Sequence, residues 1–111
     1  MYDRLLNTLC HCESTCENMT HFVKNRCDVE RRRRQLTLLR DCADICGLTQ
    51  KYIARKSPFS RDMAKLCASV CEACGCECSR FPDRESQNCA CICLNCAREC
   101  MEFAKGMAGC Y

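Results

Sequence analysis

The spacing of cysteine constrains this chain more than any other feature of its sequence. Seventeen of the 111 residues are cysteine, and in the second half two groups of four are separated by steps of four, three and four residues. These groups are Cys67, Cys71, Cys74, Cys78 and Cys89, Cys93, Cys96, Cys100. Steps that alternate between three and four return a side chain to one face of an α-helix. The pattern therefore predicts two helices that each turn a row of thiols inward.

The first half of the chain keeps the same rhythm with fewer cysteines. One row comprises Leu5, Leu9, Cys12, Cys16, Met19 and Val23, and the next comprises Leu39, Cys42, Cys46, Thr49 and Ile53. After Cys100 the frame continues through Phe103, Met107 and Cys110. We call these rows the seams of the four segments. Thirteen of the seventeen cysteines lie on a seam, so most of the thiols are predicted to be interior.

Breaks between the segments fit four helices joined by short loops. Pro58 interrupts the pattern after the second seam and Pro82 after the third, because the residue before proline avoids the helical conformation. The first break falls near residues 26–30. The sequence thus predicts helices over roughly 3–27, 31–55, 60–80 and 85–107 in a single domain, 1–111. Their similar lengths favour an all-α, antiparallel up-down-up-down four-helix bundle with a cysteine-lined core.

Composition excludes several classes of protein. The formal net charge of +3 is too small to indicate nucleic-acid binding, and no run of apolar residues is long enough to span a membrane. The first residues carry an acid and no apolar signal region, so we expect a cytoplasmic protein. In a reducing cytoplasm cysteines stay as thiols and serve more often as ligands than as disulfides. An odd number of cysteines also cannot pair completely within one chain.

Thiolates on helical seams favour Cu(I) among the soft metals. Thiolates select Cu(I), zinc and iron–sulfur clusters, but stacked four-thiolate zinc sites would leave several negative charges in a low-dielectric core. One Cu(I) per thiolate leaves a neutral assembly. Residues four apart on a helix have Cβ atoms about 5–6 Å apart, which lets two sulfurs turn toward one ion. Six such pairs occur: Cys12/Cys16, Cys42/Cys46, Cys67/Cys71, Cys74/Cys78, Cys89/Cys93 and Cys96/Cys100.

Two other interpretations stay open at this point. An iron–sulfur or redox protein would carry closely spaced cluster loops, whereas these spacings are helical. A zinc-stabilised interaction module would place its short cysteine pairs on turns. We predict no enzyme, because no set of histidine, carboxylate and nucleophile converges in the sequence.

Four segments of the chain match a known family pattern: residues 40–46 (RDCADIC), 57–59 (SPF), 66–74 (LCASVCEAC) and 93–100 (CLNCAREC). Through these segments the chain, from about residue 36 onward, resembles the cytosolic branch of the bacterial copper storage proteins. The resemblance implies an antiparallel four-helix bundle, copper homeostasis through many Cu(I) ions on inward cysteines, and a homo-tetramer. The predicted metal ligands are the thirteen seam cysteines: Cys12, Cys16, Cys42, Cys46, Cys67, Cys71, Cys74, Cys78, Cys89, Cys93, Cys96, Cys100 and Cys110.

A few residues depart from the seams or from the family pattern. Cys10, Cys27, Cys76 and Cys91 are off the seams, and we expect Cys76 and Cys91 to face a neighbouring helix, a partner subunit or solvent. Met19, His11 and Cys10 are possible additional metal ligands. The run Arg31–Arg34 is predicted to be a solvated helix start near Asp28 and Glu30. Phe22, Phe59, Phe81 and Phe103 are expected to cap the ends of the core.

Overall fold

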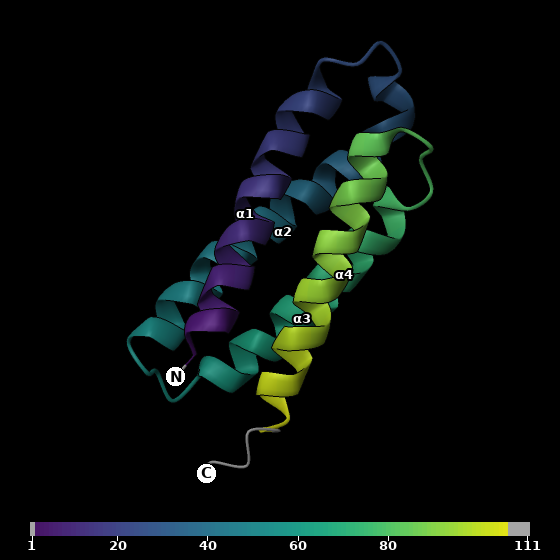
Figure 1. Cartoon of the computed structure of the whole chain (residues 1–111). Coiled ribbons are helices and arrows are strands. Elements are labelled where there is room, and N and C mark those ends of the chain that lie inside the picture. Colours follow the sequence, from purple (N-terminus) through teal and green to yellow (C-terminus); the bar gives the residue numbers. More distant parts are fainter. Residues whose placement is uncertain (1, 107–111) are drawn as a thin grey trace.

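The computed structural model describes residues 2–106, and within this range four long α-helices form an antiparallel bundle (Figure 1). They are α1 (Asp3–Lys24), α2 (Arg33–Ala54), α3 (Ser60–Cys78) and α4 (Arg84–Ala104), and a short 3₁₀ helix, η1 (Val29–Arg32), leads into α2. The predicted all-α four-helix bundle is confirmed. The largest differences in helix boundaries are at two C-terminal ends: α1 ends at Lys24 instead of near residue 27, and α4 at Ala104 instead of near residue 107.

Each helix packs against its neighbours in the chain, and α1 closes the bundle against α4. The pair α3–α4 packs most extensively and the pair α1–α4 least, while the backbones of the diagonal pairs stay apart and only their side chains meet on the axis. The resulting rod measures 49 × 19 × 19 Å between its Cα atoms. A helix of 22 residues is about 33 Å long, so the seams run along most of the interior.

Local interactions fix the helix ends where prolines interrupt the seams. After α2, Lys56 adopts a left-handed conformation with φ of 56°, and the Ser57 amide donates to the carbonyl of Tyr52 at 2.9 Å. This is the Schellman arrangement that closes a helix C-terminus. Before α4, the Asp83 carboxylate accepts from the Ser86 amide at 2.9 Å and caps the helix. Both turns reverse the chain within a few residues.

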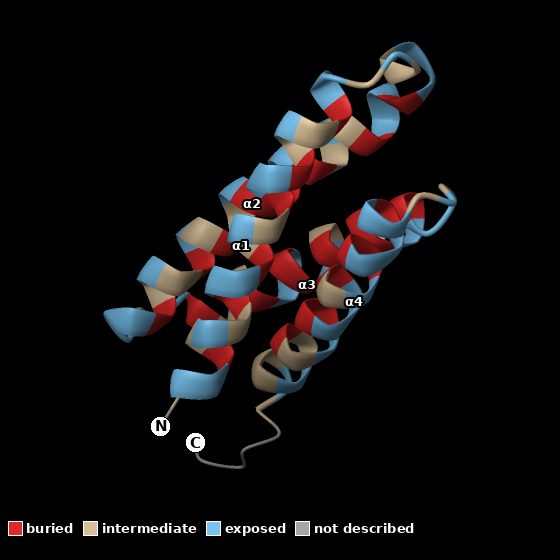
Figure 2. Ribbon diagram, turned by 45° about the horizontal axis from the view of Figure 1, so that its top comes forward, coloured by how far each residue is buried: buried red, intermediate tan, exposed pale blue. Residues whose placement is uncertain are grey.

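The core lies along the bundle axis, where the buried sides of the four helices face one another (Figure 2). It contains the seam residues from Leu5 to Cys100, together with small residues such as Ala43, Ala68 and Ala90. Within residues 2–106, no helix is both long and apolar enough to cross a membrane. As far as Cys100, the seams predicted from the sequence therefore form the interior of the folded chain.

Candidate metal centre

Twelve seam cysteines form a column of thiols along the bundle axis. All twelve have a relative accessibility of 0%: Cys12, Cys16, Cys42, Cys46, Cys67, Cys71, Cys74, Cys78, Cys89, Cys93, Cys96 and Cys100. Helices α1 and α2 contribute two each, and α3 and α4 contribute four each. Cys110 lies outside the described residues, so its predicted place on the α4 seam stays a prediction.

Ten of the twelve sulfur atoms of this column lie within hydrogen-bonding distance of at least one other. The Sγ of Cys71 is 3.6–3.8 Å from those of Cys42, Cys46, Cys67 and Cys96. Further sulfur pairs separated by 3.6–3.9 Å are Cys93 with Cys12, Cys16, Cys74 and Cys89, Cys12 with Cys42, and Cys46 with Cys67. These pairs connect ten sulfurs into one network, in which Cys71 and Cys93 are the two hubs.

Two groups of four sulfurs are compact enough to surround a metal ion. Cys12, Cys42, Cys46 and Cys71 form one group, and Cys12, Cys16, Cys42 and Cys93 form the other, with all Sγ atoms of a group within 4.8 Å of one another. With a metal–sulfur bond of about 2.3 Å, three thiolates around one ion are about 4 Å apart. The sulfurs therefore already stand near ligand spacing. Because Cys12 and Cys42 belong to both groups, neighbouring ions would share thiolates.

The surroundings of the two hub thiols, Cys71 and Cys93, favour their protonated form. Hydrogen bonds with neighbouring thiols, together with burial, raise the pKa of Cys71 and of Cys93 above the usual value for a thiol. Among the buried residues described, Arg32 is the only cation, and it lies at one end of the column in ion pairs with Asp28 and Asp83. Several anionic four-thiolate sites would thus lack counter-charges, whereas one Cu(I) per thiolate would need none.

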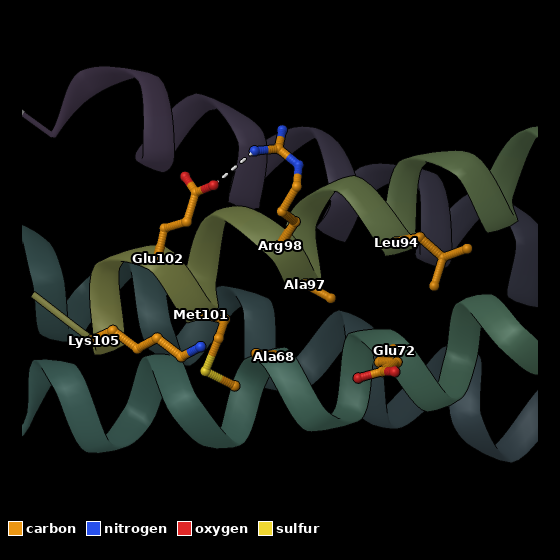
Figure 3. A pocket seen from close by; sticks show the side chains of 8 residues that line it. All are labelled: Ala68, Glu72, Leu94, Ala97, Arg98, Met101, Glu102 and Lys105. Carbon is orange, nitrogen blue, oxygen red and sulfur yellow. Dashed lines mark hydrogen bonds and ion pairs between the residues drawn. The ribbon is translucent and has the colours of Figure 1, made fainter. Parts of the chain in front are cut away.

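Helices α3 and α4 supply eight of the twelve buried thiols, and small residues let these two helices approach closely. A Cβ added to Gly75 would lie 2.7 Å from Cγ of Leu94, so only glycine fits here without a shift. Ala68, Ala90 and Ala97 are also buried along this contact. A surface pocket of about 430 Å³ lies outside it, where the Met101 sulfur is visible beside Ala68 (Figure 3). No seam cysteine lines this pocket, because the helix contact separates it from the thiol column.

Apolar residues close one end of the column, which we call the apolar end. Leu5 and Leu9 of α1 and Ile53 of α2 are buried there. Phe103 packs edge-on against Tyr2, with ring centroids 5.0 Å apart. The first two seams therefore end in hydrocarbon, as their sequence predicts.

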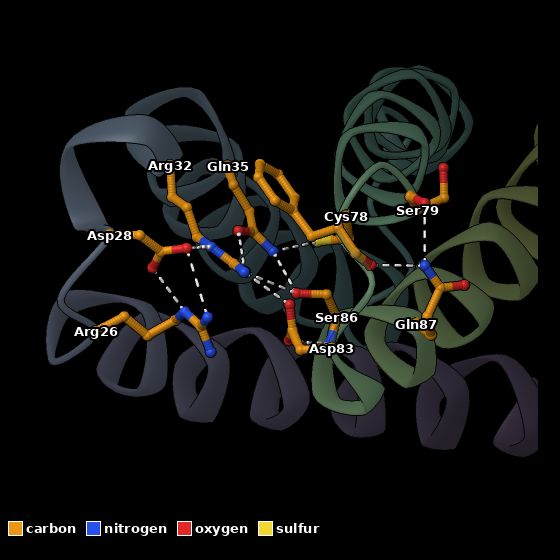
Figure 4. Close-up of polar contacts among 10 residues, drawn as sticks. Arg26, Asp28, Arg32, Gln35, Cys78, Ser79, Asp83, Ser86 and Gln87 are labelled. Carbon is orange, nitrogen blue, oxygen red and sulfur yellow. Dashed lines mark hydrogen bonds and ion pairs between the residues drawn. The ribbon is translucent and has the colours of Figure 1, made fainter.

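A buried polar network closes the opposite end, which we call the polar end (Figure 4). The Arg32 guanidinium donates to Gln35 Oε1 and to Ser86 Oγ at 3.2 Å each, and its Cζ lies 4.3 Å from the centroid of the Phe81 ring. The Gln35 amide in turn donates to Ser86 Oγ at 2.9 Å and to Cys78 Sγ at 3.5 Å. The network thus connects the last thiol of α3 to charged groups at the protein surface.

This network corrects one expectation from the sequence and adds residues that the sequence analysis missed. Arg32 was expected to be solvated with the rest of its basic run, but it is only 2% exposed. No role was predicted for Gln35 or Ser86, although both continue a seam: Gln35 stands four residues before Leu39, and Ser86 three before Cys89. The seam spacing was a signal that could have identified them.

The off-seam cysteines lie outside the core. Cys10, Cys27, Cys76 and Cys91 are all exposed. Exposure to solvent is one of the placements expected for Cys76 and Cys91. The structure therefore does not bring Cys10 to the thiol column.

The other residues singled out in the sequence divide between surface and core. His11 is exposed and lies away from the thiols, whereas Met19 is buried on the α1 seam, as its spacing predicts. Phe59 is 61% exposed, so its predicted role as a cap on the core is wrong.

Known proteins of the same shape bind copper. The chain superimposes on the Cu(I)-bound copper storage protein BsCsp3 of Bacillus subtilis with a TM-score of 0.89 and 31% identity, covering 93% of this chain and 97% of that one. It also superimposes on the copper storage protein Ccsp of Streptomyces lividans, loaded with 10 copper equivalents, with a TM-score of 0.88 and 27% identity. That comparison covers 93% of this chain and 83% of Ccsp.

Sequence comparison agrees with the structural one. An uncharacterized cysteine-rich protein of Bacillus subtilis (strain 168), YhjQ, is 39% identical over 72 residues, which are 63% of this chain and 58% of that protein. The match thus spans less than two thirds of YhjQ. The family described as copper storage protein, Csp, matches residues 1–105. With a cysteine-lined four-helix bundle and a family match over nearly its whole length, the chain belongs to the copper storage protein family.

Proposed function

We propose that this protein binds and stores Cu(I), many ions per chain, on the thiolates of its seam cysteines. The observation that carries the proposal is the column of twelve fully buried thiols that contains no interleaved cation among the described residues. A core of this kind supplies soft ligands and little else, and soft thiolates select Cu(I). The copper contents of BsCsp3 and Ccsp, proteins of the same fold, support the same assignment.

The thirteen seam cysteines would act as ligands through a simple exchange. Each incoming Cu(I) forms bonds to sulfur and displaces thiol protons to solvent, and copper stays in the +1 state throughout. Cys12 and Cys42, which belong to both four-sulfur groups, would bridge neighbouring ions. At full loading, with one ion and one lost proton for each thiolate, the interior is neutral.

The two other interpretations from the sequence are less well supported. Iron–sulfur clusters usually take ligands from closely spaced loops, whereas all twelve buried cysteines lie within helices. Zinc would suit the sulfur separations, but each four-thiolate zinc site would carry two negative charges without a nearby cation. The metal-bound protein should therefore absorb in the ultraviolet and lack the brown colour of an iron–sulfur protein.

A competition titration tests the proposal directly. Fully reduced protein is titrated anaerobically with Cu(I) in the presence of a strong chromophoric Cu(I) chelator. We expect tight uptake of roughly one ion per seam cysteine before the chelator takes copper, with helical content unchanged by circular dichroism. Saturation at two or three equivalents would refute storage and favour a single small metal site.

A matched pair of double variants then tests which thiols carry the capacity. Cys71→Ser with Cys93→Ser removes both hubs of the sulfur network, so we expect a loss of several ions in the same titration. Cys76→Ser with Cys91→Ser changes two exposed thiols of the same two helices, and we expect the capacity to stay within about one ion of wild type. Equal losses from the two pairs would contradict the assignment of the inward column as the store.

We further propose that the protein works in the cytoplasm as a homo-tetramer and catalyses no reaction. The support is the resemblance to the cytosolic branch of the family and a reducing compartment that would keep seventeen cysteines as thiols. Light scattering of the reduced protein after gel filtration tests the assembly. A mass of one chain over the micromolar range would refute the tetramer and leave the storage proposal intact.

A further inference from the structure

Both ends of the thiol column are closed, so an ion cannot reach the sulfurs along the bundle axis without displacing packed groups. At the apolar end, Leu9 has no exposed surface and Leu5 and Ile53 have almost none. At the polar end, Arg32 is held by ion pairs to Asp28 at 3.1 Å and Asp83 at 2.8 Å. Uptake of copper therefore requires either the opening of an end or a way in through the side.

The side of the bundle is least well packed between α1 and α4. A surface pocket of about 260 Å³ lies between these helices, toward the polar end. It is lined by Thr15, Asn18, Met19, Phe22, Glu85 and Asn88. Its volume is slightly below that of a typical drug-binding site, so it can admit a small copper complex but no folded partner.

Met19 connects this pocket to the thiol column. Its side chain belongs to the buried core and is 5% exposed, yet it lines the pocket. Cys16 precedes it by three residues on the same helix face, and Cys89 directly follows Asn88, another lining residue. The Sγ atoms of Cys16 and Cys89 lie 3.6 and 3.8 Å from that of Cys93, one of the two hubs. The pocket thus leads to the sulfur network through a single methionine.

Three other surface pockets along residues 2–106 have neither a seam methionine nor a seam cysteine in their lining. The pocket between α3 and α4 contains Met101 (Figure 3), but no seam cysteine lines it, and Leu94 of its lining packs closely against Gly75. A pocket between α1 and α2 is lined by polar residues and Leu48, and it includes no seam residue. A third, at the apolar end, meets the seams at Ile53 and Phe103 and includes no sulfur.

From these observations we infer that Cu(I) enters the store laterally, between α1 and α4, with the Met19 thioether as its first protein ligand. The inference rests on the proposed storage function. A thioether suits this step because it is soft, neutral and unprotonated at any physiological pH, so it accepts Cu(I) without releasing a proton. Glu85 adds a negative charge at the pocket, which favours a cationic or neutral copper complex over an anionic one.

The transfer balances without any oxidant or reductant. Met19 Sδ replaces one ligand of the incoming complex, and the free carrier ligand leaves through the pocket. A thiol of Cys16 or Cys89 then loses its proton to solvent and forms a bond to copper, while the bond to Met19 breaks. Copper remains Cu(I), and each ion stored releases the carrier ligand and the thiol proton. Met19 is then free for the next ion.

Uptake kinetics test this route. Reduced protein is mixed anaerobically with the Cu(I)–acetonitrile complex in a stopped-flow instrument, and copper–thiolate absorbance in the ultraviolet is followed. Met19→Leu keeps the volume of the side chain and removes the sulfur. We expect it to slow uptake of the first equivalents by about tenfold, the lower end of what loss of a supporting ligand costs. Equilibrium capacity should stay within about one ion of wild type.

Three further variants separate this route from the alternatives. Met101→Leu makes the same change in the α3–α4 pocket and should leave the rate unchanged. Asn88→Trp fills the α1–α4 pocket and should slow uptake as Met19→Leu does. Gln35→Ala loosens the polar end and should not speed uptake.

An unchanged rate in Met19→Leu or in Asn88→Trp overturns the lateral route, as does faster uptake by Gln35→Ala. If Met19→Leu shows full capacity and an unaltered uptake rate, the lateral route is rejected but storage is not. Failure of the wild-type protein to take up copper would reject storage as well.

Discussion

The replacement of Arg32 by alanine removes the cation that holds the polar end together. In the folded protein the guanidinium is 2% exposed and contacts Asp28, Asp83, Gln35 and Ser86. Removing one partner of a buried ion pair typically costs about 3–5 kcal/mol, because the remaining charge stays desolvated. Here the lower end applies. The reason is that the Asp28 and Asp83 side chains are 27% and 13% exposed to solvent, and that Asp28 retains its ion pair with Arg26. We therefore expect a loss of about 3 kcal/mol.

The neighbouring residue supplies a control with the same chemistry and no burial. Arg33 pairs with Glu30 at 2.7 Å, but both side chains are 74% exposed. Such surface pairs contribute about 0–1 kcal/mol, so Arg33→Ala should change the stability little. Urea unfolding of the reduced, metal-free proteins, followed by circular dichroism, measures both changes from the shift of the midpoint at constant slope. A loss below about 1 kcal/mol for Arg32→Ala, or equal losses for the two variants, would refute the view that this network closes the bundle.

Two further properties should follow from the same structure. Gly75→Ala should destabilise the metal-free protein by about 1–3 kcal/mol, because the added methyl group clashes with Leu94. Gly47→Ala meets only the end of a flexible glutamate side chain and should be neutral or stabilising. Urea unfolding that ranks the two variants in the opposite order would contradict the close α3–α4 contact. Hydrogen bonding from Arg26 lowers the pKa of Asp28 to about 2 from its ordinary 3.8, so Asp28 stabilises the fold above about pH 4 and stops doing so as the pH falls through 2. The stability difference between wild type and Asp28→Asn, measured by denaturant unfolding from pH 7 to pH 2, should therefore shrink below about pH 4, and a constant difference would refute this assignment.

The sequence predicts the helices and the inward cysteines because one physical constraint determines both. A residue that recurs every three or four positions can be buried only on one face of a helix, and cysteine packs in a core as a small hydrophobe. Cys71 and Cys93, the hubs of the sulfur network, were therefore predicted to be interior without any knowledge of their partners. Their partners could not be predicted, because sulfur separations of 3.6–3.9 Å depend on the rotation of each helix about its own axis.

The polar end was harder to predict because residue type and position conflict there. Gln35 and Ser86 occupy seam positions but are polar, and Arg32 lies within a run of four arginines that reads as solvated surface. Their burial becomes favourable only when Asp28 and Asp83 approach from different loops to complete the network. Such long-range compensation leaves no periodic trace in a sequence, apart from the seam spacing that these residues share with the cysteines.

The arrangement of the seams reconciles a core of thiols with a stable fold before any metal binds. A buried cysteine contributes less apolar surface than a leucine, and each such exchange lowers stability by on the order of 1–2 kcal/mol. The stabilising contacts that replace them lie around the column: Leu5, Leu9 and Ile53 at one end, the Arg32 network at the other, and the close contact of α3 with α4 along the side. This explains why α1 and α2 carry only two buried cysteines each, since their seams also supply the leucine, valine and isoleucine of the two ends. A longer thiol column would hold more metal but would take those positions from the residues that keep the empty bundle folded.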